Sequence, residues 1–291
     1  MNNMIDWHIH SNASDGFYTP EDLVDIIKKS DINAAITDHD TVQGVKIAME
    51  NGGEGVLVPG IELSTFDGGT KVHLLGYHID YKDGSLENEL KPIQEKRSKR
   101  SEELLEKAHK RNLWENVSYD EIKEKNPSSV YISSVHIATE LAHKGYYKSV
   151  VEAQENVNRE SLYEQDAEPF APYLRDGLNL LKKYGKIVSL AHLNELKKED
   201  FEEARFVSWM KDVGLDAMEA ISSKYNPEQI VRYIGFAKRF DLKITVGSDF
   251  HWKESTPKVK IGIELDSTLN EDILKALIMS REEVYELLVV L

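Results

Sequence analysis

Polar and apolar side chains alternate along the first predicted strand, residues 4–10. Asp6, His8 and His10 occupy every second position, and apolar residues fill the positions between them. Because successive side chains of a strand point to opposite faces, this period of two sends the three polar groups to one face. With a rise of about 3.3 Å per residue, the two imidazoles lie about 7 Å apart, too far for a mutual hydrogen bond but able to point at one cation. The strand therefore indicates half of a metal site, with a pair of satisfied core histidines as the alternative.

Short apolar strands alternate with helices through the rest of the first 84 residues. Thr19 as N-cap and Pro20 at the first helical position predict a helix that runs to about Lys29. Three more strands and one more helix are expected from the apolar patterns: strands at 33–37, 56–63 and 71–77, and a helix at 41–50. This alternation favours a parallel α/β architecture.

Charged, helical sequence interrupts the alternation between about Gly84 and Glu168 and contains no strand-helix unit. We therefore expect an inserted helical subdomain over 85–168 and a barrel formed by 1–84 and 169–291. The alternation then returns with further elements: strands at 187–192, 215–220 and 243–251, and helices at 173–184, 227–240, 270–279 and up to residue 291. Seven strands in total are close to the number that a closed α/β barrel needs.

Polar residues collect where the predicted strands end. In α/β barrels and open α/β sheets the loops at the carboxyl ends of the strands meet at one site. Seven candidate ligands lie at or near such ends: His10, His39, Glu62, His73, His192, Asp249 and His251. Asp15 follows in the loop after the first strand. These imidazoles and carboxylates are too many for one ion and enough for two or three that share a carboxylate. Nitrogen and oxygen ligands suit Zn, Mn or Fe better than Mg or Ca.

Composition narrows the possible metals and partners. The chain has no cysteine, which excludes disulfides and thiolate ligands. Its net charge of −15, from 36 Lys and Arg against 51 Asp and Glu, disfavours binding to the backbone of duplex nucleic acid. A small phosphate ester fits if bound divalent ions make the site locally positive. No signal-peptide core or membrane-spanning run is found, so we expect a cytoplasmic protein with no membrane partner.

The motifs together resemble those of the polymerase and histidinol phosphatase (PHP) family. They follow the family's order over nearly the whole chain: Asp6-Trp7-His8-Ile9-His10-Ser11, Ser14-Asp15-Gly16, Thr37-Asp38-His39-Asp40, Pro59-Gly60-Ile61-Glu62, Ala191-His192 and Gly247-Ser248-Asp249-Phe250-His251. The resemblance implies a distorted seven-stranded (β/α)7 barrel with an inserted helical subdomain. Within this family, the chain is similar to the stand-alone phosphoesterases that act on 3′,5′-nucleoside bisphosphates.

Carried over by position, the resemblance implies a trinuclear centre. The first two of the three implied ligand sets share Glu62, which would bridge those ions. The sets are His8, His10, Glu62 and Asp249 for the first ion, Glu62, His73 and His192 for the second, and Asp15, His39 and His251 for the third. The implied chemistry is in-line attack of a metal-activated hydroxide on phosphorus, for which no protein nucleophile is required.

Contacts to the substrate are expected from four residues: His136, Arg97, Arg100 and Lys224. His136 matches a family position near the substrate, with a surface histidine as the alternative reading. The two arginines lie one turn apart and are candidates for a second phosphate, or form a solvated helix face. The family's Arg-Pro-His reads Ser134-Val135-His136 here, and Ser223-Lys224-Tyr225 replaces a segment that often contains a histidine.

Two further carboxylates flank the predicted ligands. Asp6 and Asp40 are candidates to orient ligand imidazoles through the second ring nitrogen. For Asp40 we favour the alternative, an N-cap of the helix that follows.

The leading hypothesis is a metal-dependent phosphoesterase acting on small phosphorylated metabolites, most plausibly nucleotides. A cyclic phosphodiesterase and a histidinol-phosphate-like phosphatase are alternatives within the family. An amidohydrolase also places His-x-His on its first strand, but Asp15, His39 and His73 favour phosphate chemistry. A non-catalytic, metal-stabilised binding module is the alternative of another class.

Overall fold

The computed structural model describes residues 4–159, 169–196, 198–251 and 259–264. Its strands form one sheet in the order β7-β6-β5-β4-β3-β2-β1-β8. The strands run over β1 (Met4–Ile9), β2 (Asn33–Ile36), β3 (Leu57–Asp67), β4 (Thr70–Tyr77), β5 (Ile187–Leu190), β6 (Ala217–Ser222), β7 (Lys243–Gly247) and β8 (Ile263–Glu264). All seven strands expected from the sequence are present, whereas the helices expected at 270–279 and up to residue 291 lie outside the described residues.

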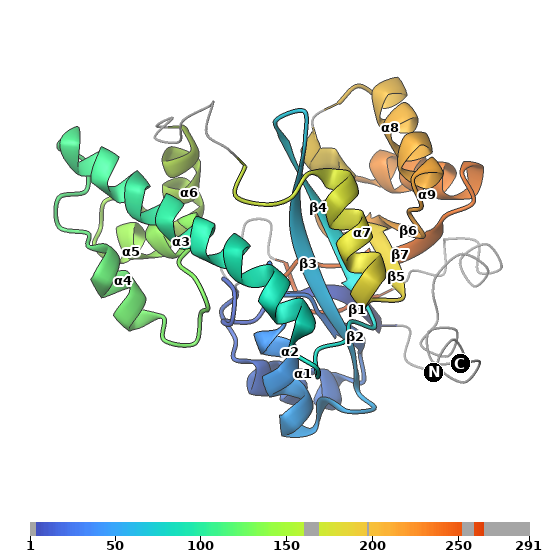
Figure 1. Cartoon of the computed structure of the whole chain (residues 1–291), viewed down its shortest axis with the longest axis horizontal. Coiled ribbons are helices and arrows are strands. Elements are labelled where there is room, and N and C mark those ends of the chain that lie inside the picture. Colours follow the sequence, from blue (N-terminus) through green and yellow to red (C-terminus); the bar gives the residue numbers. More distant parts are fainter. Residues whose placement is uncertain (1–3, 160–168, 197, 252–258, 265–291) are drawn as a thin grey trace.

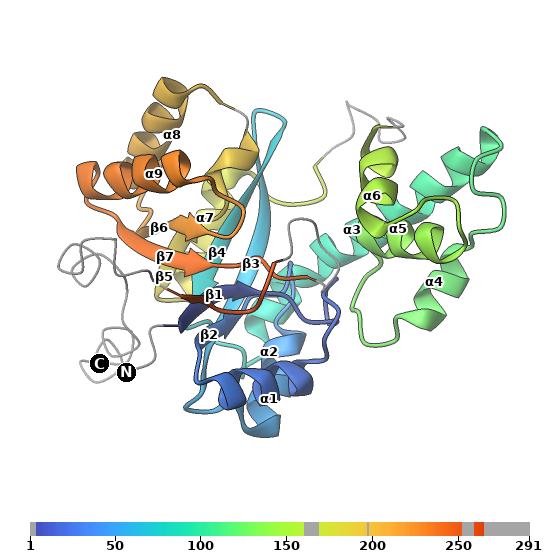
Figure 2. The same ribbon diagram turned by 180° about the vertical axis from the view of Figure 1, so that it is seen from behind.

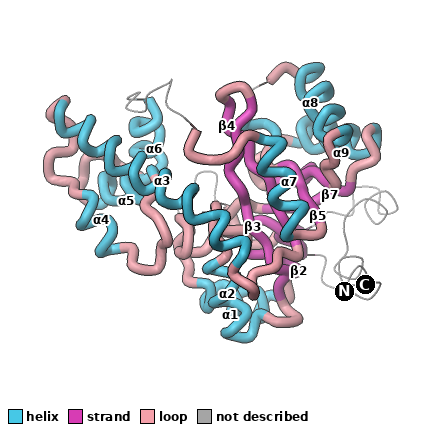
Figure 3. The backbone as a smooth tube through the Cα atoms, viewed as in Figure 1, coloured by secondary structure: helices cyan, strands magenta, loops and turns pink. Residues whose placement is uncertain are grey.

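The sheet nearly closes on itself where β1 meets the end of β7. The backbone N–H of Asp249 donates to the carbonyl of His8 at 2.9 Å, and the N–H of His10 donates to the carbonyl of Phe250 at 3.0 Å. Figure 2 shows β1 beside β7, and Figure 3 shows the strands gathered in the middle of the molecule with helices around them. The predicted α/β fold with a distorted seven-stranded barrel is confirmed.

One strand of the barrel runs against the others. β4 pairs antiparallel with both β3 and β5, while β1–β2, β2–β3, β5–β6 and β6–β7 are parallel. Gly68 and Gly69, both at positive φ, join β3 to β4 in a tight hairpin without a crossover helix, so the chain must reverse direction. Among the seven strands expected from the sequence, the parallel architecture therefore has one exception, and the short β8 also pairs antiparallel with β1.

Helices cover the outside of the barrel. They comprise α1 (Pro20–Ser30), α2 (Gln43–Ala48) with a π-turn at Met49–Gly53, α7 (Leu174–Tyr184), a 3-10 turn at Leu193–Leu196, α8 (Asp200–Asp212) and α9 (Pro227–Arg239). The Thr19 side chain caps α1 by accepting from the N–H of Asp22, as predicted. Apolar side chains of α7, among them Leu174, Leu178 and Leu181, are buried in the same core cluster as residues of β3, β4 and β5.

The segment expected as an insertion contains, in its described part, helices joined by turns and loops and no strand. It contains α3 (Ser85–Lys110), α4 (Tyr119–Lys125), α5 (Ser134–His143) and α6 (Val150–Arg159), which lie to one side of the barrel in Figure 1. These helices share a hydrophobic cluster of their own, with Leu105, Ile122, Ile137, Leu141 and Val157 buried in it. The first part of α3 instead buries Leu86, Leu90 and Ile93 in the barrel core, so α3 connects the two clusters. None of the helices in the described ranges is long and apolar enough to cross a membrane.

Candidate metal centre

The carboxylate of Glu62 lies at the middle of a cluster of imidazoles. Its Oε2 atom is 3.2 Å from Nε2 of His8, 3.2 Å from Nε2 of His10 and 2.8 Å from Nδ1 of His39. Its Oε1 atom is 2.8 Å from Nδ1 of His73 and 2.8 Å from Nε2 of His192. One buried carboxylate thus faces five imidazoles, three on one oxygen and two on the other.

A second carboxylate, Asp249, closes the other side of this cluster. Its Oδ1 atom lies 3.1 Å from Nε2 of His10 and 3.4 Å from Nδ1 of His251. His251 in turn places Nε2 3.5 Å from Oδ1 of Asp15. The structure therefore brings together all nine ligands expected from the sequence.

The donor atoms fall into four groups, each compact enough to hold a metal ion. In each group the ligand atoms lie within 4.8 Å of one another: His10, Asp15, His39 and His251; His8, His10, Glu62 and Asp249; His39, Glu62 and His73; and His192, Glu195 and Asp249. The second group coincides with one ligand set implied by the family resemblance. Glu195 is a member that the sequence reasoning missed, although its position three residues after His192 on a helical turn was a usable signal.

Many of these donor atoms are buried without a hydrogen-bond partner. They include Nε2 of His8, both ring nitrogens of His10, Oδ1 of Asp15, Nδ1 of His39, Oε2 of Glu62 and Oδ1 of Asp249. Buried polar atoms normally have a partner, and such a concentration of exceptions requires an explanation. Nitrogen and carboxylate donors converging in this way fit divalent cations, so the residues present are compatible with the implied metals.

The protonation states agree with a ligand role. Burial opposes ionisation of Glu62 and Asp249, yet the imidazoles around Glu62 and the ammonium of Lys224 beside Asp249 hold the pKa of both carboxyls well below the usual range. Burial lowers the pKa of His39 to about 3 and that of His73 to about 4, so both rings are neutral at pH 7. His8, His10 and His192 differ, because neighbouring carboxylates outweigh their burial and raise their pKa values, that of His10 to about 9. This excess of negative charge around His10 is what a bound cation would balance.

Local backbone geometry at the ends of β5 and β7 aims two of these side chains. His192 has φ of 20° and Asp249 has φ of 52°, values that non-glycine residues rarely adopt. Gly247 allows β7 to pass close to β1, because a Cβ there would lie 2.3 Å from Cβ of His8. Backbone strain of this kind is characteristic of functional sites.

Glu219 on β6 is a supporting residue that the sequence reasoning missed. Its Oε1 atom lies 3.0 Å from Nδ1 of His8, and its Oε2 atom accepts from the N–H of His192 at 3.0 Å. It therefore orients the ring of one candidate ligand and the backbone of another. A single charge inside the apolar strand Ala217–Ser222, buried along its whole length, was the available signal.

Asp6 does not orient an imidazole, contrary to one of the roles considered for it. Its carboxylate accepts from the N–H and hydroxyl of Ser248 at 2.9 and 2.7 Å and from the N–H of Gly262 at 2.8 Å. It also accepts from the backbone N–H of His8, not from the ring. Asp6 thus fixes the turn after β7, just before Asp249.

The favoured N-cap role of Asp40 is wrong. α2 has Val42 at its N-cap position without a side-chain cap, and Asp40 Oδ1 instead accepts from the N–H of Ser64 at 2.7 Å. Its Oδ2 atom pairs with Nε of Arg97 at 2.6 Å, and Arg97 also donates to Ser64 Oγ at 2.6 Å. Arg97 is therefore not part of a solvated helix face, since it ties α3 of the insertion to the barrel.

His136 and Lys224 each lie near a carboxylate of the centre, His136 near Asp15 and Lys224 beside Asp249. His136 at the start of α5 is buried, and its Nδ1 accepts from the N–H of Ser133 at 3.0 Å in a capping box, which excludes the surface reading. The Lys224 ammonium contacts Oδ2 of Asp249 and lies 3.2 Å from Oε1 of Glu195. Burial opposes the charge of Lys224, but Asp249 and Glu195 raise its pKa above the usual range.

Two ligands do not lie at the ends of their strands as expected. Glu62 is in the middle of β3 because that strand extends to Asp67, well beyond the end of β2. His73 lies in the first half of β4. It still faces the centre because an antiparallel strand brings its amino half to the edge where its parallel neighbours end.

Comparison with known proteins gives relatives over most of the chain, although no model of a protein family matches the sequence. The 5′-3′ exoribonuclease Rnm of Salmonella typhimurium is 28% identical over 271 residues, covering 89% of this chain and 88% of the relative. The 5′-3′ exoribonuclease of Haemophilus influenzae is 28% identical over 275 residues, covering 87% and 91%. The 3′,5′-nucleoside bisphosphate phosphatase of Chromobacterium violaceum is 25% identical over 261 residues, covering 85% and 87%.

Two solved structures share the fold over nearly their whole length. A candidate metal-dependent phosphoesterase from Bifidobacterium adolescentis superposes with a TM-score of 0.77 at 26% identity, covering 96% of this chain and 97% of that one. A Chromobacterium violaceum protein named as an amidohydrolase, with bound sulfate and no metal, gives a TM-score of 0.78 at 23% identity, covering 96% and 99%. At that identity the second likeness concerns the fold alone.

Fold, site and relatives together define a metal-dependent hydrolase that acts on phosphate esters. The similarity to these relatives agrees with the resemblance of its motifs to those of the PHP family of metal-dependent phosphoesterases.

Proposed function

We propose that this protein hydrolyses phosphate esters of nucleotides, with 3′,5′-nucleoside bisphosphates as its preferred substrates. The catalytic centre contains two or three divalent ions, and Mn, Fe or Zn suit the nitrogen and oxygen donors. The proposed ligand sets are those of the family: His8, His10, Glu62 and Asp249; Glu62, His73 and His192; and Asp15, His39 and His251. Bound there, the ions would acidify an attacking water and neutralise the phosphoryl and leaving oxygens.

The position of Glu62 supports this proposal most strongly. Each of its two oxygens faces a different group of imidazoles, at 2.8 to 3.2 Å. A carboxylate with that arrangement is suited to bridge two ions. No serine, cysteine or lysine nucleophile is needed, because the attacking group is a water.

Residues around the ligand sets would position the phosphate. Since Nδ1 of His136 accepts from Ser133, the neutral ring carries its proton on Nε2, and the charge of Asp15 acts on this ring. We assign the Nε2–H group of His136 as a donor to the phosphate or the leaving oxygen. Lys224, one-third exposed beside Asp249, is assigned to clamp a phosphoryl oxygen.

Arg97 has a different role in this proposal. Two of its donors are already used by Asp40 and Ser64, so it holds the insertion against the barrel and adds positive charge. Arg100, one turn further along α3, is assigned to the second phosphate. Its guanidinium lies 5.4 Å from the ring centroid of Phe170.

Removal of nucleotides from the 5′ end of short RNA is the second candidate function. Relatives at 28% identity are named 5′-3′ exoribonucleases. This reaction requires the same attack on phosphorus. The two candidates differ in whether the 3′ phosphate that is attacked is a terminal monoester or a diester that continues into the next nucleotide.

A substrate panel tests the proposal. Protein loaded with Mn²⁺ is incubated with adenosine 3′,5′-bisphosphate, adenosine 5′-monophosphate, a 5′-phosphorylated trinucleotide, a cyclic nucleotide, histidinol phosphate and an amide, and the products are quantified. We expect the highest kcat/KM for the bisphosphate. Preference for the trinucleotide would favour the second candidate, and hydrolysis of none of the esters would contradict both.

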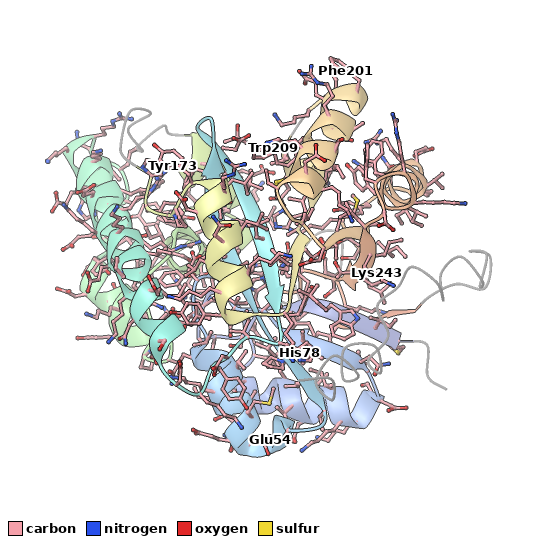
Figure 4. All side chains as sticks on the ribbon, turned by 45° about the vertical axis from the view of Figure 1, so that its right-hand side comes forward. Glu54, His78, Tyr173, Phe201, Trp209 and Lys243 are labelled. Carbon is pink, nitrogen blue, oxygen red and sulfur yellow. The ribbon has the colours of Figure 1, made fainter. Side chains whose placement is uncertain are left out.

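Matched variants assign the activity to this centre. Glu62→Gln should reduce kcat at least about a thousandfold, since it removes the bridging charge. Glu54→Gln is the control, because Glu54 is 70% exposed and lies at the lower edge of the molecule in Figure 4. Equal activity in the two variants would exclude the proposed centre.

A further inference from the structure

The inner face of the β3–β4 hairpin continues beyond the metal centre towards the tip of the hairpin. Directly paired residues of an antiparallel ladder share a face, and the register pairs Ser64 with His73 and Phe66 with Lys71. Since His73 contacts Glu62, Phe66 and Lys71 lie on the same face as the centre, one step further out. Figure 1 shows this hairpin between the helical insertion and α8.

Aromatic rings and guanidinium groups meet over this outer part of the face. The rings of Phe66 and Phe170 contact edge to face, with centroids 5.3 Å apart. The guanidinium carbons of Arg97 and Arg100 lie 4.8 and 5.4 Å from the centroid of Phe170. Both phenylalanines are only partly buried, so part of each ring surface remains accessible.

Lys71 adds a cation at the mouth of the centre. Its side chain is exposed, and within the described residues no carboxylate forms an ion pair with it. Its register partner Phe66 lies on the hairpin face that carries His73 and Glu62, so Lys71 stands one step outside the centre on that face.

We propose that Phe66, Lys71, Arg100 and Phe170 form an outer subsite that binds the part of the nucleotide that is not cleaved. The base packs on the phenylalanine rings, and a second phosphate lies between the ammonium of Lys71 and the guanidinium of Arg100. This inference rests on the proposed nucleotide substrate and specifies how it is selected. With the 3′ phosphate attacked at the metal centre, the second phosphate is the 5′ monoester, which a nucleoside bisphosphate and a 5′-phosphorylated RNA strand both carry.

The composition of the patch supports this ligand chemistry. The chain has a net charge of −15, yet three cations, Lys71, Arg97 and Arg100, gather beside the centre. Aromatic rings interleaved with basic side chains are the usual binding surface for single nucleotides and single strands, since every base has a π-face. A simple phosphate monoester would use the metal ligands alone and gain nothing from this surface.

Charge-removing variants test the subsite. Lys71→Ala and Arg100→Ala are compared with the control Arg205→Ala, which removes an exposed arginine of α8. Arg205 lines a cavity of about 420 Å³ together with Asp67, whose side chain lies on the other face of the hairpin. Each subsite variant should raise KM for adenosine 3′,5′-bisphosphate about tenfold, the loss expected for one charge-assisted hydrogen bond. The kcat/KM for p-nitrophenyl phosphate should stay within about twofold in all three variants. Equal losses on both substrates, or no loss on either, would overturn the subsite.

Phe66→Ala separates base binding from phosphate binding. It should raise KM for adenosine 5′-monophosphate and for the bisphosphate alike, whereas Lys71→Ala and Arg100→Ala should affect the monophosphate less. A 5′-phosphorylated trinucleotide extends the test to RNA, because its first nucleotide carries the same 5′ monoester. Lys71→Ala should raise KM for the trinucleotide and for the bisphosphate alike, and a penalty on neither would overturn the phosphate contact.

Binding measurements distinguish failure of the subsite from failure of the proposed function. Adenosine 3′,5′-bisphosphate is titrated calorimetrically into the protein under conditions in which the nucleotide is not hydrolysed. Binding to Lys71→Ala should be about tenfold weaker than binding to the wild type. If no ester is hydrolysed but this difference is found, the proposed activity is wrong and the subsite stands. If hydrolysis is observed but the affinities are equal, the subsite is wrong and the activity stands.

Discussion

Nδ1 of His8 lies 3.0 Å from Oε1 of Glu219, and both side chains are almost completely buried. A carboxylate behind a ligand imidazole fixes its tautomer and orientation and raises its basicity. Glu219→Ala should therefore weaken divalent metal binding about 10- to 100-fold while the barrel remains folded. Competition titration with a metallochromic chelator measures this. Glu228→Ala on the surface of α9 is the control, and an unchanged affinity in Glu219→Ala would contradict the orienting role.

Metal removal should destabilise the protein. The unpartnered buried donors of the centre gain their partners only from a cation, so metal binding contributes to folding stability. An ion present at 100 times its Kd adds about 2.7 kcal/mol. For a chain of this size we expect chelation to lower Tm by at least about 5 °C and re-addition of Mn²⁺ to restore it. Calorimetry with elemental analysis of the same samples checks this, and an unchanged Tm in fully stripped protein would contradict it.

Breaking the ion pair between Arg97 and Asp40 should cost more than breaking a surface pair. Asp40 is fully buried and Arg97 is 12% exposed, so Arg97→Met leaves an uncompensated charge inside the protein. The expected loss of stability is about 3–5 kcal/mol. Lys99→Met on the same helix, 76% exposed, should cost less than about 1 kcal/mol. Denaturant unfolding measures both, and the double variant Arg97→Met with Asp40→Asn should recover much of the loss if the buried charge is the cause.

The pH dependence of stability should contain a contribution from His78, which is labelled in Figure 4. Burial and the positive charge of Lys186 lower its pKa to about 4, below the unfolded value of about 6.5. Between these two pKa values the unfolded chain binds more protons, so the free energy of unfolding falls as the pH drops from about 6.5 towards 4. Asparagine tolerates the φ of 54° at this position. His78→Asn should therefore reduce the slope of the unfolding free energy against pH by an amount that corresponds to at most one bound proton. Identical slopes in wild type and variant would refute the prediction.

Lys224 should act against metal binding and for phosphate binding. Its ammonium contacts Asp249 and Glu195, both members of a group compact enough for a cation. Lys224→Met should therefore strengthen divalent metal binding several-fold and raise the inhibition constant of inorganic phosphate about tenfold, whereas Lys224→Arg should change both less. Metal titration and phosphate inhibition, measured separately, test the two effects. A variant that weakens metal binding would contradict the assignment.

Most of the barrel could be predicted because its signals are local. Alternation in β1 and the capping of α1 by Thr19 depend on neighbours in the sequence. The candidate ligands could be predicted because strand ends converge in such folds, so even distant residues such as His8 and Asp249 are brought together by the architecture.

The remaining features depend on partners that the sequence pattern does not reveal. The reversed direction of β4 follows from a hairpin whose turn is Gly68–Gly69, and a strand's apolar pattern is the same in either direction. Asp40 pairs with Arg97 and does not cap α2, and this pairing depends on how α3 crosses the barrel. Contacts of this kind arise from tertiary packing, which overrides local capping preferences.

The contact between Asp6 and Ser248 joins positions 242 residues apart, at the seam where β1 meets the end of β7. The same seam joins His8 to Asp249, two candidate ligands. A nascent chain cannot complete the centre until β7 has left the ribosome. Acquisition of the full complement of ions is therefore a late event in biogenesis, and shorter translation products lack it.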